Sequence, residues 1–281
     1  MSAPDPWSTM PSIPLSVPDV LAVERAESTY FRRFLDHAAP EDRARLGIRT
    51  AAVRDGVATV VTADPSRYWT KAMGFGPDAP VDDALVADVV AFSRAAGAAQ
   101  GTLAIAPLAL PVDWSAICEH HALVAASTWS KYACSVTEVV PGRTDLPVRP
   151  LTVDDVPGWA RIIREAFGMT DPDLTPMLRG AVEDPVAQVF GAFDGDLLVG
   201  AGALYVVDGV GSLNTGGTLP THRRRGVQSA LLAARAAAAA DSGCRLLTAE
   251  TGGSDDDPSA RNLVRAGFVR AYHRVNWTWT A

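Results

Sequence analysis

The two halves of the chain follow the same order of predicted elements. "LSVPDVLAVERAESTYFRRF" begins at Leu15, "LTVDDVPGWARIIREAFGM" begins at Leu151, and each combines a short apolar start, a turn-and-cap cluster and a helical pattern. Later in both halves a glycine-marked helix end leads into an apolar strand, a polar loop, a short helix and an alternating strand. The matching segments lie about 140 residues apart, which is typical of a duplicated domain.

A linker separates the two halves. Residues 139–150, "VVPGRTDLPVRP", carry three prolines and a glycine. A chain of 281 residues is long enough for two domains. We therefore predict one domain over residues 1–144, with a loose N-terminal tail, and a second over residues 145–281.

The second half predicts an α+β fold. Its expected elements are a strand (147–151), two helices (156–167 and 174–182), three strands (187–196, 197–209 and 211–219), a helix (227–240), a strand (244–250), a short helix and a closing strand pair. Asp-Gly pairs stand where hairpin turns are needed. Each domain is thus expected to be a mixed, mainly antiparallel sheet flanked by helices, with one strand-helix-strand crossover.

Composition excludes several classes of function. With 48% hydrophobic and 20% charged residues the chain should fold as a globular, cytoplasmic protein. A formal net charge of -7 argues against nucleic acid as the main partner. We see no secretion signal and expect no membrane span, since Arg235 and Asp241 interrupt the short Ala-rich stretch. Three scattered cysteines indicate reduced thiols.

One basic loop stands out in this acidic chain. "TLPTHRRRGVQSALL" (218–232) predicts a strand that ends near Pro220 and a helix that begins just after Gly226. A helix N-terminus presents free N–H groups and partial positive charge, which bind phosphate oxygens, and arginines add charge-assisted contacts. The loop is therefore interpreted as a pyrophosphate cradle. The alternative is a solvated basic turn that offsets neighbouring carboxylates.

These motifs resemble the GNAT superfamily of acyl-CoA-dependent N-acyltransferases. Its R/Q-x-x-G-x-G/A pattern matches here at Arg223 and Gly226, and "DDPSARNLVRAGFV" is similar to its later segment, with Gly267-Phe268. The resemblance implies two tandem GNAT-like domains, as in mycothiol synthase. The second would bind acetyl-CoA as co-substrate, and the first would be degenerate, because it lacks the arginine pattern. The implied cofactor-binding residues are Gly217, Thr218, Leu219, Arg223, Arg224, Arg225, Gly226, Val227, Gln228, Ser229 and Asn262.

Two positions depart from the family pattern. Gln228 replaces the usual small residue, and Leu263 stands where many relatives carry a tyrosine assigned as general acid. The loss of an acid is chemically tolerable, because a thiol with a pKa near ~8.5 is a fair leaving group. We also expect Gly226→Glu to abolish cofactor binding, with its carboxylate placed where the phosphates should be.

The resemblance implies direct transfer of an acetyl group to a small-molecule amine. A backbone N–H near Gly217 or Thr218 would polarise the thioester, and Glu250 is the candidate base, although a glutamate at a strand end is often only solvated. The alternative function is a non-catalytic acyl-CoA-binding sensor or scaffold, which Leu263 favours. The oligomeric state is left open, a homodimer included.

Two further groups of residues invite a functional reading. Cys118-Glu119-His120-His121 suggests a metal ligand set but has no evident partners in the sequence, so no metal is expected. The tryptophans can line an aromatic pocket or pack in the core, and both readings stay open for Trp69, Trp114, Trp129, Trp277 and Trp279.

Overall fold

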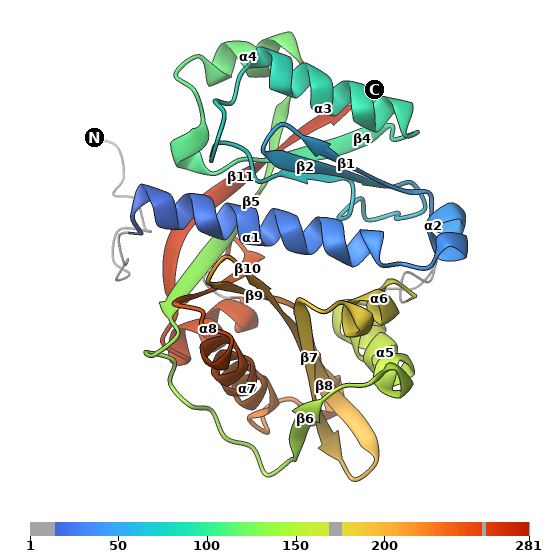
Figure 1. Cartoon of the computed structure of the whole chain (residues 1–281), viewed down its shortest axis with the longest axis vertical. Helices are drawn as coiled ribbons and strands as arrows, with labels where there is room; N and C mark the ends of the chain where they lie inside the picture. The colour runs from blue at the N-terminus through green and yellow to red at the C-terminus, as the bar shows by residue number, and fades with distance from the viewer. Residues whose placement is uncertain (1–14, 169–175, 255–256, 281) are drawn as a thin grey trace.

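The computed structural model describes residues 15–168, 176–254 and 257–280. In this part of the chain the strands of both halves form one sheet of eleven strands, in the order β1-β2-β3-β4-β11-β5-β10-β9-β8-β7-β6 (Figure 1). The predicted N-terminal tail and the beginning of the helix predicted at residue 174 lie outside the described residues.

The first half supplies four helices and five strands within the described residues. They are α1 (Val17–Asp36), α2 (Pro40–Leu46), β1 (Ile48–Val53), β2 (Gly56–Val61), β3 (Lys71–Met73), α3 (Asp83–Ala95), β4 (Gln100–Ala104), α4 (Trp114–His120) and β5 (Val124–Ser135).

The described part of the second half supplies four helices and six strands. They are β6 (Val148–Pro150), α5 (Val156–Phe167), α6 (Met177–Glu183), β7 (Ala187–Asp194), β8 (Leu197–Val207), β9 (Val210–Thr218), α7 (Val227–Asp241), β10 (Leu246–Gly252), α8 (Pro258–Arg265) and β11 (Val269–Thr280).

The predicted fold class is confirmed. Neighbouring strands pair antiparallel except β3 with β4 and β9 with β10, so each half contains one parallel crossover. In the second half this crossover is the predicted β9-α7-β10 unit. The expected closing strand pair is wrong, because residues 269–280 form the single long strand β11, which has two irregularities in its register with β5 but no turn.

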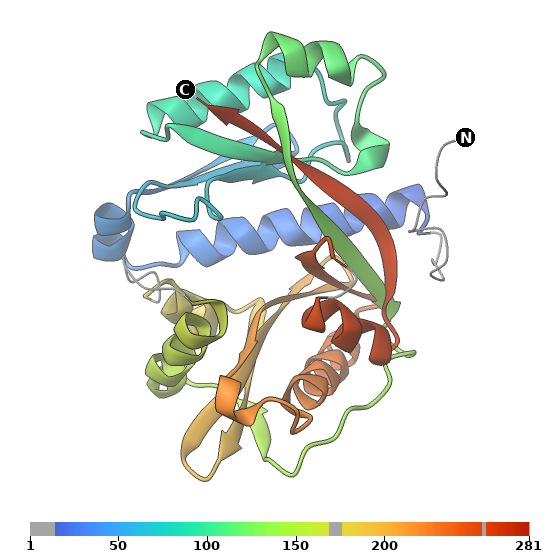
Figure 2. The ribbon, with the colours of Figure 1, turned by 180° about the vertical axis from the view of Figure 1, so that it is seen from behind.

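The last strand of each half crosses into the sheet of the other half. β5 pairs antiparallel with β10, from Leu246 opposite Ser135 to Gly252 opposite Trp129. β11 lies between β4 and β5, and Figure 2 shows these two long strands running together from one half of the molecule to the other. The domain boundary near residue 144 stays a prediction. In space, β5 and β11 each pair with strands from the other side of this boundary.

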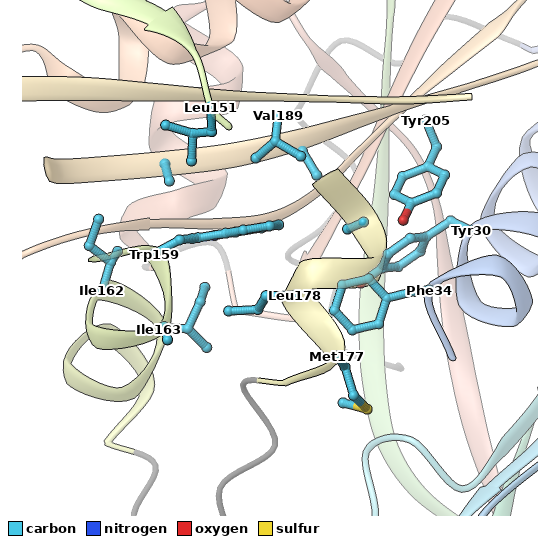
Figure 3. Packing of buried hydrophobic residues seen from close by; sticks show 14 of the residues in the cluster. Tyr30, Phe34, Leu151, Trp159, Ile162, Ile163, Met177, Leu178, Val189 and Tyr205 are labelled. Carbon is cyan, nitrogen blue, oxygen red and sulfur yellow. The ribbon is translucent and has the colours of Figure 1, made fainter. Parts of the chain in front are cut away.

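Helix α1 lies between the two halves and carries much of the core that joins them (Figure 1). Ser16 caps its N-terminus by accepting a hydrogen bond from the backbone N–H of Asp19. Its aromatic side chains pack with Trp159, Leu178 and Tyr205 of the second half in one buried cluster (Figure 3). Full burial of such a side chain stabilises the fold by about 1.5–3 kcal/mol, so the halves are joined by a hydrophobic core.

The parallel strands β9 and β10 separate part-way along their length. They pair only from Val210 with Leu246 to Leu213 with Ala249, although β9 continues to Thr218 and β10 to Gly252. Beyond that point β9 has an irregular register with β8. The separation leaves a gap in the sheet, and the candidate site lies there.

Candidate active site

A cavity of about 1150 Å³ occupies the gap between β9 and β10. Its walls come from both strands, from the loop between β9 and α7, from α7 and α8, and from residues of the first half. Ligand pockets typically lie where a sheet opens in this way and where domains meet.

The arginine loop forms one end of this cavity. Arg223, Arg224, Gly226 and Gln228 all line it, as do Val227 and Ser229. Gly226 has φ +74° and is the N-cap residue of α7, so the predicted need for glycine at this position is met. The free N–H groups of the first turn of α7 therefore face a cavity edged by arginines.

Arg225 has a different role from its two neighbours. Its guanidinium pairs with Asp145 at 2.8 Å and with Asp194 at 2.7 Å, and the residue does not line the cavity. The prediction that Arg225 faces the cofactor is not supported by this placement, because its side chain is held by two carboxylates outside the cavity. For this one arginine the alternative reading, a basic turn that offsets carboxylates, describes the contacts.

The linker supports the loop from outside. Thr144 donates a hydrogen bond from Oγ1 to the carbonyl oxygen of Arg225 at 2.8 Å. A Cβ at Gly226 would lie 2.1 Å from the carbonyl oxygen of Arg143, and a Cβ at Gly142 would meet Ser229. A side chain at Gly226 would thus be directed at the linker, which corrects the expectation that its carboxylate would replace the phosphates.

The other predicted cofactor residues divide between cavity and core. Gly217, Thr218 and Asn262 line the cavity, whereas Leu219 is buried in the cluster that joins the two halves. Thr218 Oγ1 is buried and has no hydrogen-bond partner among the described residues. A buried hydroxyl without a partner beside a cavity is available to a ligand.

Glu250 lies at the cavity wall but is not a solvated glutamate. Its side chain is 10% exposed, and Oε1 lies 2.6 Å from Nη2 of Arg274. Burial, with a contribution from the nearby carboxylate of Glu27, raises the pKa of Glu250 to about 7, against the opposing effects of Arg274 and Lys131. The side chain is therefore balanced between its two protonation states near neutral pH, as a general base requires.

Glu250 belongs to a buried charge network from three distant parts of the chain. Arg274 of β11 is fully buried and contacts Glu24 at 2.7 Å and Glu27 at 2.6 Å, both on α1. Lys131 of β5 lies 2.7 Å from Glu27. These ion pairs hold the pKa of Glu27 well below its usual range, in spite of the burial that opposes ionisation. Sequence reasoning missed this network.

One sequence signal for the network exists. Glu24 and Glu27 stand three residues apart, on the same side of a helix whose neighbouring positions Val23, Ala26 and Tyr30 are apolar and buried. Two carboxylates within an apolar helix face require cationic partners. The sequence does not say which cations these are.

A second buried arginine reaches the cavity from α7. Arg235 is 3% exposed, lines the cavity and forms no ion pair with a carboxylate in the described part of the chain. It donates to the carbonyl oxygens of Leu231 at 3.0 Å and Ala203 at 3.3 Å. Burial lowers its pKa to about 10. In the sequence Arg235 is recognisable only as a charge that interrupts the Ala-rich stretch.

The position of the missing tyrosine is apolar in the structure as well. Leu263 is 2% exposed and packs in a hydrophobic cluster at the cavity wall. Hydroxyl-bearing residues line the cavity at other positions, among them Tyr30, Tyr68 and Thr215. The hydroxyl oxygens of Tyr30 and Thr215 lie 3.0 Å apart.

The tryptophans divide between the two readings left open. Trp129 and Trp69 line the cavity, and Trp69 also packs in the buried cluster that joins the two halves. Trp114, Trp277 and Trp279 belong to a separate core cluster, in which β11 packs with the first half.

The histidines of the suspected metal motif meet a carboxylate away from this site. His120 and His121 lie 2.6 and 2.9 Å from Oδ1 of Asp83, and the ligand atoms of these three residues lie within 4.8 Å of one another. None of the three lines the cavity, so they take no part in the candidate site.

The comparisons with known proteins agree with this site. The family model described as "Acetyltransferase (GNAT) domain" matches residues 147–249. This stretch is a GNAT acetyltransferase domain. The match confirms the predicted family and the acyltransferase class of the enzyme. It covers the arginine loop and ends one residue before Glu250.

Solved structures extend the GNAT likeness of the fold to both halves. A GCN5-related N-acetyltransferase from Kribbella flavida is 17% identical, with a TM-score of 0.64 over 92% of this chain and 96% of that one. A tandem GNAT protein from the clavulanic acid biosynthesis pathway is 14% identical, with a TM-score of 0.55 over 92% and 96%. A functionally unknown conserved protein from Staphylococcus epidermidis is 10% identical, with a TM-score of 0.54 over 87% and 99%.

Two further findings concern sequence relatives and membrane spans. No curated protein is similar enough in sequence to match the chain. Among the described helices, none combines the length and apolar character needed to cross a membrane.

Proposed function

We propose that the protein is an acetyl-CoA-dependent N-acetyltransferase that transfers the acetyl group directly to a small-molecule amine. The observation that carries this proposal is that one cavity joins an anion-binding helix N-terminus to Glu250, whose pKa of about 7 suits a general base. GNAT enzymes as a family use acetyl-CoA.

The arginine loop would hold the diphosphate of the co-substrate. The backbone N–H groups that begin α7 and the guanidinium groups of Arg223 and Arg224 are suited to phosphate oxygens. Beyond Leu213, β9 has no paired strand on its β10 side in the described part of the chain. An extended amide-containing arm could pair with this free edge, as peptides do when they extend a sheet.

The reaction needs a neutral amine and a polarised thioester. Glu250 would take a proton from the incoming ammonium group, and the amine nitrogen would then form a bond to the carbonyl carbon. A backbone N–H near Gly217 or Thr218 would stabilise the developing oxyanion. The carbon–sulfur bond breaks as the carbonyl re-forms, the second nitrogen proton passes to water, and CoA leaves as a thiolate.

The first half is proposed to bind no CoA. In the first half the loop after β3 corresponds to the arginine loop of the second half. Three backbone N–H groups of this loop already bind a carboxylate of the chain itself. Oδ2 of Asp55 accepts hydrogen bonds from the backbone N–H groups of Gly76, Asp78 and Ala79, at 3.1, 2.9 and 3.2 Å. Since these donors are taken, they are not available to a phosphate.

The test combines binding with turnover. Calorimetric titration of acetyl-CoA should show about one site per chain, and a panel of primary amines should produce amine-dependent release of CoA. Binding without release over a broad panel would favour the alternative, an acyl-CoA sensor or scaffold. Absence of binding would overturn both functions.

A further inference from the structure

The first half supplies a part of the cavity wall that consists mainly of aromatic side chains, and what is inferred from them rests on the proposed acetyltransferase function. Five such side chains line the cavity, and we call them the aromatic box: Tyr30, Phe34, Tyr68, Trp69 and Trp129. They come from α1, from the segment before β3 and from the crossing strand β5.

The aromatic rings of the box pack against one another. Phe34 and Trp69 are stacked with centroids 4.9 Å apart, Tyr68 meets Trp69 edge to face at 5.1 Å, and Tyr68 lies 5.8 Å from Trp129. Figure 3 shows Tyr30 and Phe34 together beside α6. Tyr30, Phe34 and Trp69 are buried, whereas Tyr68 and Trp129 are half-buried and offer most of the free surface.

The side-chain nitrogen of Lys71 already lies against two rings of the box, and burial lowers the pKa of this lysine from its ordinary value. Nζ of Lys71 lies 4.4 Å from the ring centroid of Tyr68 and 5.3 Å from that of Trp129. Lys71 is 5% exposed and pairs with no carboxylate in the described residues. Its charge would repel a second ammonium group placed against the same rings.

The carboxylates lie where the reacting nitrogen must go. Glu250 and Glu27 both line the cavity, and Arg274 and Lys131 hold them in place. An acceptor that delivers its ammonium group to Glu250 can lay the rest of its body in the aromatic box, because Glu250 and the box line the same cavity. The box favours flat apolar surface, because stacking and edge-to-face contacts add to the burial of area.

We propose that the acceptor is a primary amine carried on a flat, apolar body, with its nitrogen at Glu250 and its flat body against Tyr68 and Trp129. 2-Phenylethylamine represents this class. A polyhydroxylated amine would find only the phenol hydroxyls of Tyr30 and Tyr68 as partners in the box, and that of Tyr30 already pairs with Thr215. A diamine would bring its second charge next to Lys71.

The experiment compares four acceptors at saturating acetyl-CoA by release of CoA. 2-Phenylethylamine should exceed 1,4-diaminobutane and glucosamine in kcat/KM by at least about tenfold, because both the rings and Lys71 discriminate against them. It should also exceed L-phenylalanine, because the added carboxylate stands on the carbon that carries the amine and would lie beside the carboxyl groups of Glu250 and Glu27. Preference for glucosamine or 1,4-diaminobutane would overturn the inference and leave the acetyltransferase function intact.

Variants locate the effect in the box. Trp129→Leu should raise KM for 2-phenylethylamine about fivefold or more without changing KM for acetyl-CoA, and Trp129→Phe, which keeps a flat ring, should change it much less. An unchanged KM in Trp129→Leu would contradict the placement. If L-phenylalanine is the better acceptor and loses this advantage in Lys71→Met, the site recognises a carboxylate and the inference is wrong.

Failure of the proposed function can be told apart from failure of this inference. If no amine is acetylated although acetyl-CoA binds, saturation-transfer NMR measures binding of 2-phenylethylamine in the presence of CoA. Binding that is lost in Trp129→Leu supports the box without turnover. No binding to the unmutated protein overturns it.

Discussion

The hydroxyl of Tyr30 on α1 lies 3.0 Å from the hydroxyl of Thr215 on β9, across 185 positions of sequence. Thr215 has φ +47°, which is strained for a β-branched residue, and its carbonyl oxygen accepts a hydrogen bond from Nε1 of Trp159 at 3.4 Å. Such strain, about 1–3 kcal/mol, persists only where the surroundings hold it. Tyr30 thus connects the first half to the strand that lines the site.

Tyr30→Phe should lower kcat while leaving KM for acetyl-CoA nearly unchanged. The ring still fills its place in the core, but Thr215 loses the partner that holds it, and a lost hydrogen bond of about 1 kcal/mol corresponds to a severalfold rate effect. Steady-state kinetics of Tyr30→Phe, Thr215→Val and the double variant check this. Strictly additive effects in that cycle would show that the two hydroxyls act independently.

Glu250→Gln should remove the pH dependence of the rate near neutrality. The base acts when deprotonated, so kcat/KM should rise as pH increases through about 7, the value to which burial raises the pKa, and level off above it. In the glutamine variant the rate should fall by about 10²–10⁴-fold, and the inflection should disappear. An inflection that persists in the variant would remove Glu250 from the mechanism.

Neighbouring arginines provide a matched pair of variants. Arg224→Ala should weaken acetyl-CoA binding by about 1.5–3 kcal/mol, since Arg224 lines the cavity and would contact a phosphate through a charge-assisted bond. Arg225→Ala should weaken it less, because Arg225 pairs with Asp145 and Asp194 outside the cavity. Calorimetric titration of acetyl-CoA into both variants measures the two losses of binding free energy. Equal losses would show that the pairing of Arg225 outside the cavity does not keep it from binding the cofactor.

Two glycines with nearly equal φ angles allow the effect of backbone strain to be distinguished from the effect of a steric clash. Gly226 has φ +74° and Gly209 has φ +76°, but a Cβ at Gly226 would meet Arg143 at 2.1 Å, and a Cβ at Gly209 would meet nothing within 4 Å. Both alanine variants should lose about 1–2 kcal/mol of stability through positive φ. Only Gly226→Ala should also lose acetyl-CoA affinity, because the loop must move away from the linker. Retained affinity in folded Gly226→Ala would argue against the cradle.

Arg274→Met should destabilise the fold by about 3–5 kcal/mol. The change leaves Glu24, Glu27 and Glu250 buried without the guanidinium that contacts all three. Urea unfolding at neutral pH measures the loss. The variant should regain part of its free energy of unfolding as pH falls, since protonation removes the unpaired charges of the glutamates. A variant as stable as the unmutated protein at every pH would contradict the network.

Local features of the second half could be predicted from the sequence alone. The helix predicted over residues 156–167 is α5, and the glycine demanded at position 226 has positive φ. The hairpin predicted at Asp208-Gly209 has positive φ at both residues, and Leu263 provides no acid at the expected place. These features depend on hydrophobic period, backbone freedom and residue type within a few neighbouring positions.

The tertiary structure alone decided how the two halves share one site. Arg274 and Glu27 are 247 positions apart, and nothing in the local sequence of either names its partner. Strand exchange brings Lys131 and Arg274 to Glu250, and α1 brings Glu27 and Tyr30. Burial and long-range pairing decide whether Glu250 is solvated or buried and whether Trp129 lies in the core or at the cavity wall, and the local sequence pattern does not encode them.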